Sequence, residues 1–283
     1  MAIRDFDIIG KMMFRNSIKK ISDFFYVIPR VLFINFYKLF TRTRVFNVKR
    51  LPRNKSVILA INHTADADPI ILLAAIKRKI CFVAESENFG NWLSSFFMRK
   101  FANCIPIFNK DKSSKNAKSF KELFKISKNK NVFLGIFPEG ILNKKNGFKE
   151  FKKGAAYLSY KTNLPIIPVY MHNMNRGSES KKWVLNNRIT RGIISLVINA
   201  YRKIHIFIGE PINPIAENIL EEFQDFTNPA NYKKVINNIN EALKKEFLEL
   251  ADEADDLFSI EDDKHSGANF IDDFDENPKK LNP

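Results

Sequence analysis

The chain has 283 residues, of which 45% are apolar, and a formal net charge of +15 at pH 7. This apolar content is enough to bury a substantial core, so the composition excludes a wholly disordered chain. Only two cysteines are present, Cys81 and Cys104. This number excludes a disulfide-rich scaffold and a metal knuckle built on Cys-x-x-Cys. We expect both thiols to be reduced and buried, in a cytosolic compartment.

The charge is unevenly distributed along the chain. Residues 251–283 hold eleven Asp or Glu and three Lys or Arg, a net charge of −8, which leaves +23 for residues 1–250. Residues 1–54 alone carry a net +9. A body this basic predicts an anionic partner such as phosphate lipid, an acidic cofactor or nucleic acid. The acidic C-terminal segment is poor in apolar residues, and we expect it to be a mobile tail.

The N-terminal region combines aromatic and basic side chains. Charged residues interrupt the first 22 positions and no small-residue cleavage site follows an apolar segment, so we expect no signal peptide. Residues 24–40 are the most apolar stretch, but a helix of this length spans only about 26 Å, against a hydrocarbon core of roughly 30 Å. Arg30 and Lys38 would be costly in the bilayer centre, and Pro29 interrupts the helix. A transmembrane span is therefore disfavoured.

An amphipathic helix in the headgroup layer is the interpretation that we favour for this stretch. On a helical wheel its polar side chains fall within an arc of about 140°, and the aromatic and aliphatic ones lie outside that arc. This arrangement is typical of a helix lying at a lipid interface. The alternative is a helix that packs against the protein core. The polar arc contains Arg30, Asn35, Lys38, Thr41 and Arg42, and the apolar side chains are Phe33, Phe36, Tyr37, Leu39 and Phe40.

Beyond the N-terminal region, apolar runs of strand length alternate with helical patterns. This alternation predicts an α/β fold, with a mixed and mostly parallel sheet flanked by helices. We expect three regions: membrane-associating helices in 1–42, one catalytic domain in 43–250 and the acidic tail in 251–283. Strands are expected at 45–48, 56–61, 80–84, 105–108, 131–137, 165–171 and 204–208, and helices at 69–79, 90–101, 114–128, 152–162 and 232–251.

A first polar cluster follows the second of these strands, at Asn62, His63 and Asp68. A carboxylate five positions after a histidine, across a turn, can pair with the imidazole and leave its other nitrogen to act as a general base. The structural alternative is that Asp68, followed by Pro69, only caps the next helix. A metal site through His63, Asp66 and Asp68 is a weaker alternative, because no second histidine lies nearby.

A second cluster, Gly-Ile-Phe-Pro-Glu-Gly at 135–140, follows the fifth strand. Its two glycines have the spacing that begins a phosphate-binding loop. Ile141 and Leu142 stand where that loop needs Lys and Ser or Thr, so we reject this interpretation. A turn around Glu139 is the alternative, since Pro and Gly bracket it.

The order and spacing of these clusters resemble the 1-acylglycerol-3-phosphate acyltransferase family, within the glycerolipid acyltransferases, over roughly residues 30–210. The family's Asn-His-x4-Asp block is matched by Asn62, His63 and Asp68. Its Phe-Pro-Glu-Gly block is matched by residues 137–140, and its apolar Pro-Ile-x-Pro-Val strand by 165–169.

The resemblance implies transfer of a fatty acyl group from acyl-CoA or acyl-carrier protein to the free hydroxyl of 1-acylglycerol 3-phosphate, giving phosphatidic acid. His63 is then the general base, Asp68 orients it, and Asn62, Glu139 and Gly140 help to bind the acceptor. No metal and no organic cofactor are implied. The expected partners are the acyl donor, a lysophospholipid acceptor and an anionic membrane surface, with the enzyme peripheral on the cytoplasmic face of the cell membrane.

Two positions depart from the family pattern, since Asn109 and Leu142 stand where the family has arginine. Neither side chain can offer a charged, fork-shaped partner to a phosphate. Lys110, Lys144 and Lys145 lie beside these positions. We expect Lys110, together with Lys144 or Lys145, to bind the acceptor phosphate as point charges. The alternative is that all three are solvated surface lysines.

Two other functions remain open at this stage. The same fold could acylate glycerol 3-phosphate or an amino-lipid hydroxyl, because the two arginines are missing. A non-catalytic basic protein that binds membranes or other anions is the alternative from another class. The chain has no recognised nucleic-acid-binding motif, so we expect no nucleic-acid partner.

Overall fold

The structure is a computed structural model that describes residues 31–76, 78–90, 92–108, 113–129, 132–143, 147–174, 188–214 and 229–262. The expectations for Lys110, Lys144 and Lys145 lie outside these residues, as do those for 1–30 and for the end of the acidic tail. Cys81 and Cys104 are both buried free thiols, as expected.

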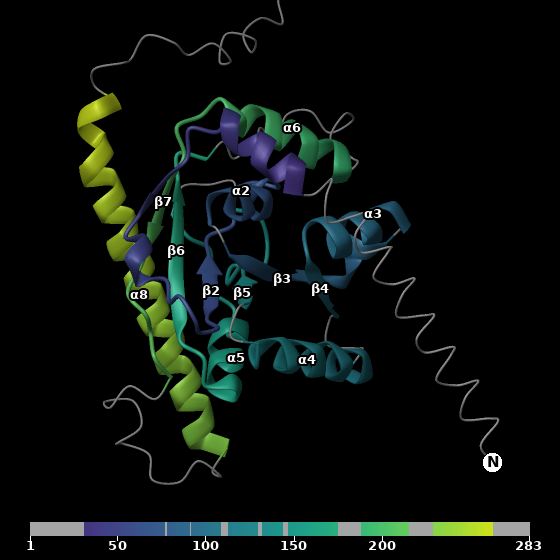
Figure 1. The fold of residues 1–283 in the computed structure, drawn as a ribbon. Coiled ribbons are helices and arrows are strands. Elements are labelled where there is room, and N and C mark those ends of the chain that lie inside the picture. Colours follow the sequence, from purple (N-terminus) through teal and green to yellow (C-terminus); the bar gives the residue numbers. More distant parts are fainter. Residues whose placement is uncertain are drawn as a thin grey trace, which may run out of the picture.

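A seven-stranded sheet forms the centre of the molecule, with the order β1-β7-β6-β2-β5-β3-β4 (Figure 1). Every neighbouring pair is parallel except β6 and β7, which are antiparallel. The predicted α/β fold with a mixed, mostly parallel sheet is confirmed, and each expected strand is present. The strands are β1 (Arg44–Phe46), β2 (Ile58–Ile61), β3 (Lys79–Glu85), β4 (Cys104–Ile107), β5 (Val132–Ile136), β6 (Ile166–His172) and β7 (His205–Ile208).

The helices cover both faces of the sheet. The α-helices are α2 (Asp68–Ala75), α3 (Trp92–Phe96), α4 (Ser113–Ser127), α5 (Gly154–Thr162), α6 (Arg188–Ala200) and α8 (Pro229–Asp262), and a further helix covers residues 31–40. Short 3-10 turns lie at η1 (Val48–Arg50) and η2 (Ser86–Phe89), and a π-helical turn at η3 (Phe97–Phe101). The single helix expected at 90–101 is therefore divided between α3 and η3.

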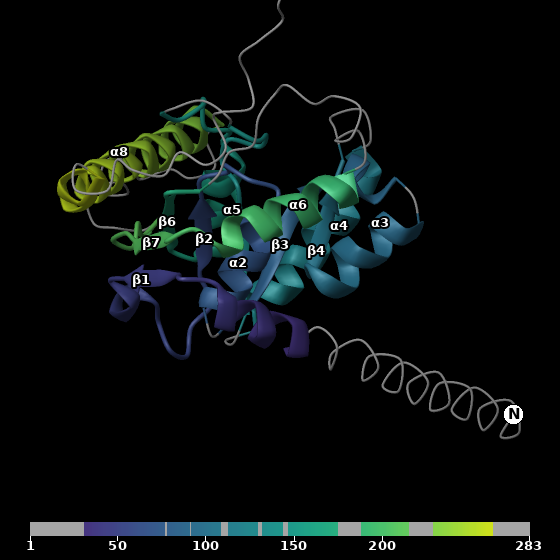
Figure 2. The same ribbon diagram turned by 90° about the horizontal axis from the view of Figure 1, so that it is seen from above.

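Strand β2 lies in the middle of the sheet and contributes to both layers of the core. All four of its residues are buried. Leu59 and Ile61 belong to the cluster that contains α2, whereas Ile58 and Ala60 belong to the cluster that contains α5 and α8. Successive side chains of a strand point to opposite faces, so an uninterrupted apolar run produces a strand buried on both sides. Figure 2 shows α2 on one side of the sheet and α5 and α8 on the other.

Helix α6 has no counterpart among the expected helices. Its sequence is rich in β-branched residues and contains Gly192, and both features lower intrinsic helix propensity. The helix is held by tertiary contacts, since Leu196 and Ala200 pack against the core cluster that contains α2.

Helix α8 runs to Asp262, beyond residue 251, where the last helix is expected to end. Its buried side chains continue past the domain boundary that we expect at residue 250. Ala254 and Phe258 are buried, and the Phe258 ring stacks on His205 with centroids 3.8 Å apart. These two residues extend the apolar stripe of α8 into a segment whose average composition is acidic.

We expect Phe258→Ala to lower the free energy of unfolding by about 3 kcal/mol, because it removes a buried ring and leaves a cavity. The neighbouring Leu257 is 50% exposed. Leu257→Ala is therefore a matched control, with an expected change below about 0.5 kcal/mol. Chemical denaturation of both variants tests this. Equal, small effects would mean that the end of α8 is not part of the core.

Candidate functional site

The two polar clusters meet at one edge of the sheet. His63 and Glu139 follow the C-terminal ends of β2 and β5, which are adjacent and parallel. In open α/β sheets this edge is where loops converge to form ligand sites. The two clusters are in direct contact, because the backbone N–H of His63 donates to Glu139 Oε1 at 3.1 Å.

The imidazole of His63 is paired with the carboxylate of Asp68. Nδ1 of His63 lies 2.9 Å from Oδ2 of Asp68. The Asp68 side chain is fully buried, whereas that of His63 is 20% exposed. No hydrogen bond to His63 Nε2 is found within the described part of the chain. Nδ1 is therefore bound to a buried carboxylate, and Nε2 is the nitrogen left on the partly exposed side of the ring.

A single carboxylate oxygen organises the whole loop. Oδ2 of Asp68 also accepts the backbone N–H groups of Thr64, at 2.8 Å, and Ala65, at 3.0 Å. An oxygen that already accepts two N–H groups takes part in the third contact as an acceptor too, so Nδ1 of His63 carries the hydrogen. Oδ1 is buried without a hydrogen-bond partner among the described residues, so every hydrogen bond between this carboxylate and the loop is made by Oδ2.

The helix-capping alternative for Asp68 is wrong. The N-cap of α2 is Ala67, and Asp68 is the first helical residue, followed by Pro69. Its carboxylate bonds to residues that precede the helix and to no N–H group within it. Pro69 fits the first turn because its missing N–H would have had no helical partner.

A column of aromatic rings supports the other side of the imidazole. The His63 ring stacks on Phe137 at 4.1 Å, and Phe137 stacks on Phe82 at 6.0 Å. Gly135 makes room for Phe82, since a Cβ at this position would lie 2.5 Å from the Phe82 ring. Gly135, the first glycine of the Gly-x-x-x-x-Gly pattern, is therefore required by packing.

Glu139 is buried and forms the tie between the two clusters. Its Oε1 accepts the N–H of His63, and its Oε2 accepts the N–H of Lys149 at 2.9 Å. It sits in a turn closed by the hydrogen bond from the N–H of Gly140 to the carbonyl of Phe137. Since both carboxylate oxygens are engaged by backbone, we interpret Glu139 as a residue that positions His63.

Gly140 is required by the shape of the same turn. Its φ is +70°, a left-handed conformation that non-glycine residues adopt rarely. A Cβ at this position would also lie 2.5 Å from Nζ of Lys152, whose side chain passes over the glycine. Lys149 and Lys152 therefore flank the turn, and neither was singled out by the sequence motifs.

Asn62 joins the site to the neighbouring strand. Its amide donates to the carbonyl of Met171 at 3.1 Å and accepts the N–H of Met171 at 2.7 Å, so both ends of the side chain are used. The residue is buried. We interpret Asn62 as a clamp between the end of β2 and β6, which differs from the expected contact with the acceptor.

Asp66 is paired with Arg191 of α6, a residue that the sequence analysis did not identify. Arg191 donates Nε to Oδ2 at 3.1 Å and Nη2 to Oδ1 at 3.0 Å. Both carboxylate oxygens of Asp66 are engaged by Arg191, which disfavours the alternative of a metal site through His63, Asp66 and Asp68. In the part of the chain that the structure describes, no group of three metal-binding side chains is present. The two partners are 125 positions apart, so no local pattern could have indicated the contact.

Leu142 stands at one of the family's arginine positions, and its backbone carbonyl contacts a lysine side chain. Nζ of Lys149 donates to the carbonyl of Leu142 at 2.8 Å. The backbone of the next residue, Asn143, donates to the carbonyl of His63 at 2.6 Å. The segment after the turn is therefore bonded to the loop at 62–68 through the backbone of Asn143, and not through the side chain at position 142.

Comparison with known proteins identifies relatives of this chain. Residues 42–172 match the protein-family model described as Acyltransferase. A Mycoplasma pneumoniae protein named "Probable 1-acyl-sn-glycerol-3-phosphate acyltransferase" is 28% identical over 208 residues, which cover 68% of this chain and 73% of that protein. A Mycoplasma genitalium protein of the same name is 26% identical over 182 residues, which cover 62% of this chain and 63% of that protein.

A similar solved structure is the crystal structure of the 1-acyl-sn-glycerophosphate (LPA) acyltransferase PlsC from Thermotoga maritima. It aligns with a TM-score of 0.49 and 19% sequence identity, covering 77% of this chain and 78% of that one. The range matched by the family model contains both polar clusters of the site, from Asn62 to Gly140.

We expect Glu139→Gln to lower stability by about 1–3 kcal/mol, because the amide NH₂ would face a buried backbone N–H that needs an acceptor. Turnover should fall as well, since His63 loses one of its anchors. The nearby Glu150 is exposed, and Glu150→Gln is the matched control. Thermal unfolding and steady-state rates check both variants. A Glu139→Gln enzyme with unchanged stability and rate contradicts the positioning role.

Proposed function

We propose that this chain is an enzyme that acylates the free hydroxyl of 1-acylglycerol 3-phosphate, and the match of residues 42–172 to the acyltransferase family model supports this proposal. The donor is an acyl thioester, either acyl-CoA or acylated acyl-carrier protein, and the product is phosphatidic acid. The observation that carries the proposal is the His63–Asp68 pair, which holds one imidazole nitrogen outward at the C-terminal edge of the sheet. The names of the two Mycoplasma relatives support this acceptor.

The proposed reaction needs no enzyme nucleophile. Nε2 of His63 takes the proton of the acceptor hydroxyl as its oxygen attacks the thioester carbonyl carbon. The tetrahedral intermediate then collapses, the carbon–sulfur bond breaks, and the proton on His63 passes to the departing thiolate. The products are the new ester and a free thiol. A thiol is a much stronger acid than an alcohol, so the thiolate is a good leaving group and the required assistance is modest.

Asp68 serves this reaction through its burial. A carboxylate behind Nδ1 keeps the hydrogen on that nitrogen, so the lone pair lies on Nε2 before the reaction. It also stabilises the imidazolium that forms once Nε2 has taken the proton. The interaction is strengthened because a buried carboxylate is shielded from water.

Membrane attachment is part of the proposal, because both the acceptor and the product are lipids. Within the described ranges, no helix is long and apolar enough to cross a bilayer. In the helix at 31–40, Ile34 and Tyr37 pack against the core, whereas most of its other apolar side chains are exposed. This pattern supports the interfacial interpretation over a core-packing helix. We infer a peripheral enzyme on the cytoplasmic face of the cell membrane, bound to anionic lipid.

The proposed phosphate site uses lysine in place of arginine. Lys110, with Lys144 or Lys145, would bind the acceptor phosphate as point charges. Lys152 is a further cation at the site, on the evidence of its passage over Gly140. The missing arginines also leave a second acceptor class open, namely a lipid hydroxyl without a phosphate, such as an amino-lipid.

We expect His63→Ala to lower turnover by at least about 10²-fold, the effect typical of removing a general base, with the fold retained. Asp68→Asn should also lower turnover while leaving substrate binding largely intact. Product formation from an acyl thioester and 1-acylglycerol 3-phosphate measures this, with the melting temperature as the control for folding. Near-normal turnover in folded His63→Ala protein would falsify the proposal.

We expect Lys110→Ala to raise KM for the phosphate-bearing acceptor by about tenfold or more and to leave KM for the acyl donor unchanged, because a charge-assisted contact to phosphate is lost. Lys152→Ala is the comparison variant. A larger effect at Lys152 than at Lys110 would move the phosphate site to the turn. Equal effects on both substrates, or full activity on acceptors without phosphate, would favour the amino-lipid alternative.

A further inference from the structure

Helix α6 has an apolar stripe that faces away from the protein. Ile193 and Val197 of the helix, and Tyr201 directly after its last residue Ala200, follow one another at intervals of four residues and are 57%, 55% and 84% exposed. Side chains at this spacing lie on one face of a helix. A folded protein rarely exposes a continuous apolar stripe without a binding partner.

The helix at 31–40 continues this apolar surface. The two helices are in direct contact, because the Tyr37 hydroxyl donates to the carbonyl of Leu196 at 2.9 Å. Burial raises the pKa of the Tyr37 hydroxyl above its usual value, so the donor stays protonated. Both helices lie at the end of the sheet towards which β2 points, which is the edge that carries His63 (Figure 1).

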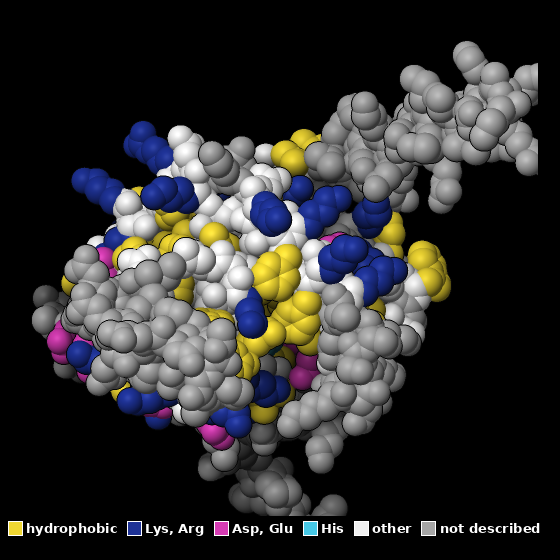
Figure 3. Space-filling view, turned by 90° about the horizontal axis from the view of Figure 1, so that it is seen from below, with side chains coloured by type: hydrophobic (Ala, Val, Ile, Leu, Met, Phe, Trp, Pro, Cys, Tyr) yellow, Lys and Arg dark blue, Asp and Glu magenta, His cyan; other side chains and the backbone are white. Residues whose placement is uncertain are grey.

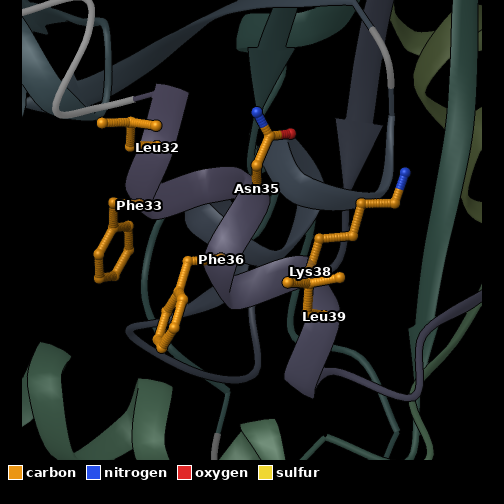
Figure 4. A pocket seen from close by; sticks show the side chains of 6 residues that line it. All are labelled: Leu32, Phe33, Asn35, Phe36, Lys38 and Leu39. Atoms are coloured by element: carbon orange, nitrogen blue, oxygen red, sulfur yellow. The ribbon is translucent and has the colours of Figure 1, made fainter.

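The outer side of this N-terminal helix is formed by large apolar side chains. Figure 4 shows Phe33 and Phe36 pointing to the same side of the helix, and Asn35 pointing away from them. An open hollow of about 720 Å³ lies against this helix. Its described lining residues are Leu32, Phe33, Asn35, Phe36, Lys38 and Leu39.

The charge of both segments has one sign. Residues 31–44 and 188–203 contain seven Lys or Arg and no Asp or Glu. This charge fits an anionic lipid surface, and it disfavours a second copy of the chain, because a two-fold interface would bring two cationic faces together. Lys and Arg side chains, mixed with apolar ones, also lie on the opposite end of the molecule (Figure 3), so charge alone does not distinguish this face.

The opposite side of α6 forms hydrogen bonds with the loop at 62–68, which is the catalytic loop of the proposed function. Arg191 binds Asp66 through two hydrogen bonds, and Ser195 Oγ accepts the backbone N–H of Ala67 at 3.2 Å. Asp66 and Ala67 lie between His63 and Asp68 in the sequence. One short helix thus contacts the loop on its inner side and exposes apolar side chains on its outer side.

We propose that α6 lies in the interface of an anionic bilayer beside the helix at 31–40 and that Arg191 positions the catalytic loop from there. The proposal rests on the proposed function, since it assigns a second lipid-binding element and a positioning residue to the same enzyme. Contact with lipid and the geometry of the His63–Asp68 loop then depend on the same helix.

The first test measures binding to vesicles, independently of activity. The variant carries Ile193→Ser, Val197→Ser and Tyr201→Ser, and its binding to mixed phosphatidylglycerol and phosphatidylcholine vesicles should fall by about tenfold or more. Leu248 and Leu257, on α8, are each 50% exposed, and their Ser variants are the matched control with unchanged binding. Unchanged binding in the α6 variant overturns the proposal, as does a change confined to dimerisation in sedimentation experiments.

The second test separates positioning from general folding. Arg191→Gln should lower kcat by about tenfold, with little change in KM or in vesicle binding, because the substrate-binding surface and the apolar stripe remain. Asp66→Asn should have the same effect, and the double variant should add nothing further. Arg191→Lys should restore only part of the rate, since lysine lacks the two-pronged geometry.

The outcomes distinguish this proposal from the proposed function. Lack of acyl transfer in the unmodified enzyme would contradict the proposed function. The vesicle experiment would still decide whether α6 binds lipid, because it does not depend on activity. Normal acyl transfer, with additive effects of Arg191→Gln and Asp66→Asn, would contradict the positioning role while the proposed function stands. A KM increase without a change in kcat would contradict it as well.

Discussion

The buried carboxylate of Asp68 is the contact on which the site depends. One oxygen accepts the N–H groups of Thr64 and Ala65 and the Nδ1 hydrogen of His63. A charged group can be buried only when such partners compensate for its lost hydration. These three hydrogen bonds compensate for the lost hydration of the carboxylate. They also fix the shape of the loop and set the tautomer of the imidazole. The shape of the loop and the state of the imidazole therefore both depend on this one oxygen atom.

The other polar residues near His63 act mainly through the backbone. Asn62 clamps β2 to β6, and Glu139 links His63 to Lys149. Two residues that motif matching assigns to substrate are thus committed to holding the loop. We interpret the exposed part of the site as the imidazole edge and Lys152, whose side chain passes over Gly140.

Much of this arrangement could be predicted from the sequence, and the remainder could not, for physical reasons. The strands are local apolar runs, and the His63–Asp68 pair spans one turn, so both leave a local pattern. Helix α6 leaves none, because its β-branched residues and Gly192 favour other conformations until it packs on the core. The Arg191–Asp66 contact joins distant segments. The roles of Asn62 and Glu139 depend on the direction of their side chains, which a motif does not specify.

The central claim is that Asp68 keeps the hydrogen on Nδ1 of His63 and leaves Nε2 free to accept a proton. Nitrogen-15 NMR of the histidine side chains, at a pH where His63 is neutral, tests it directly. The chain has only four histidines, so a His63→Gln spectrum assigns the signal by difference. The account predicts the Nδ1–H tautomer in the native enzyme. A neutral His63 with its hydrogen on Nε2 would contradict it.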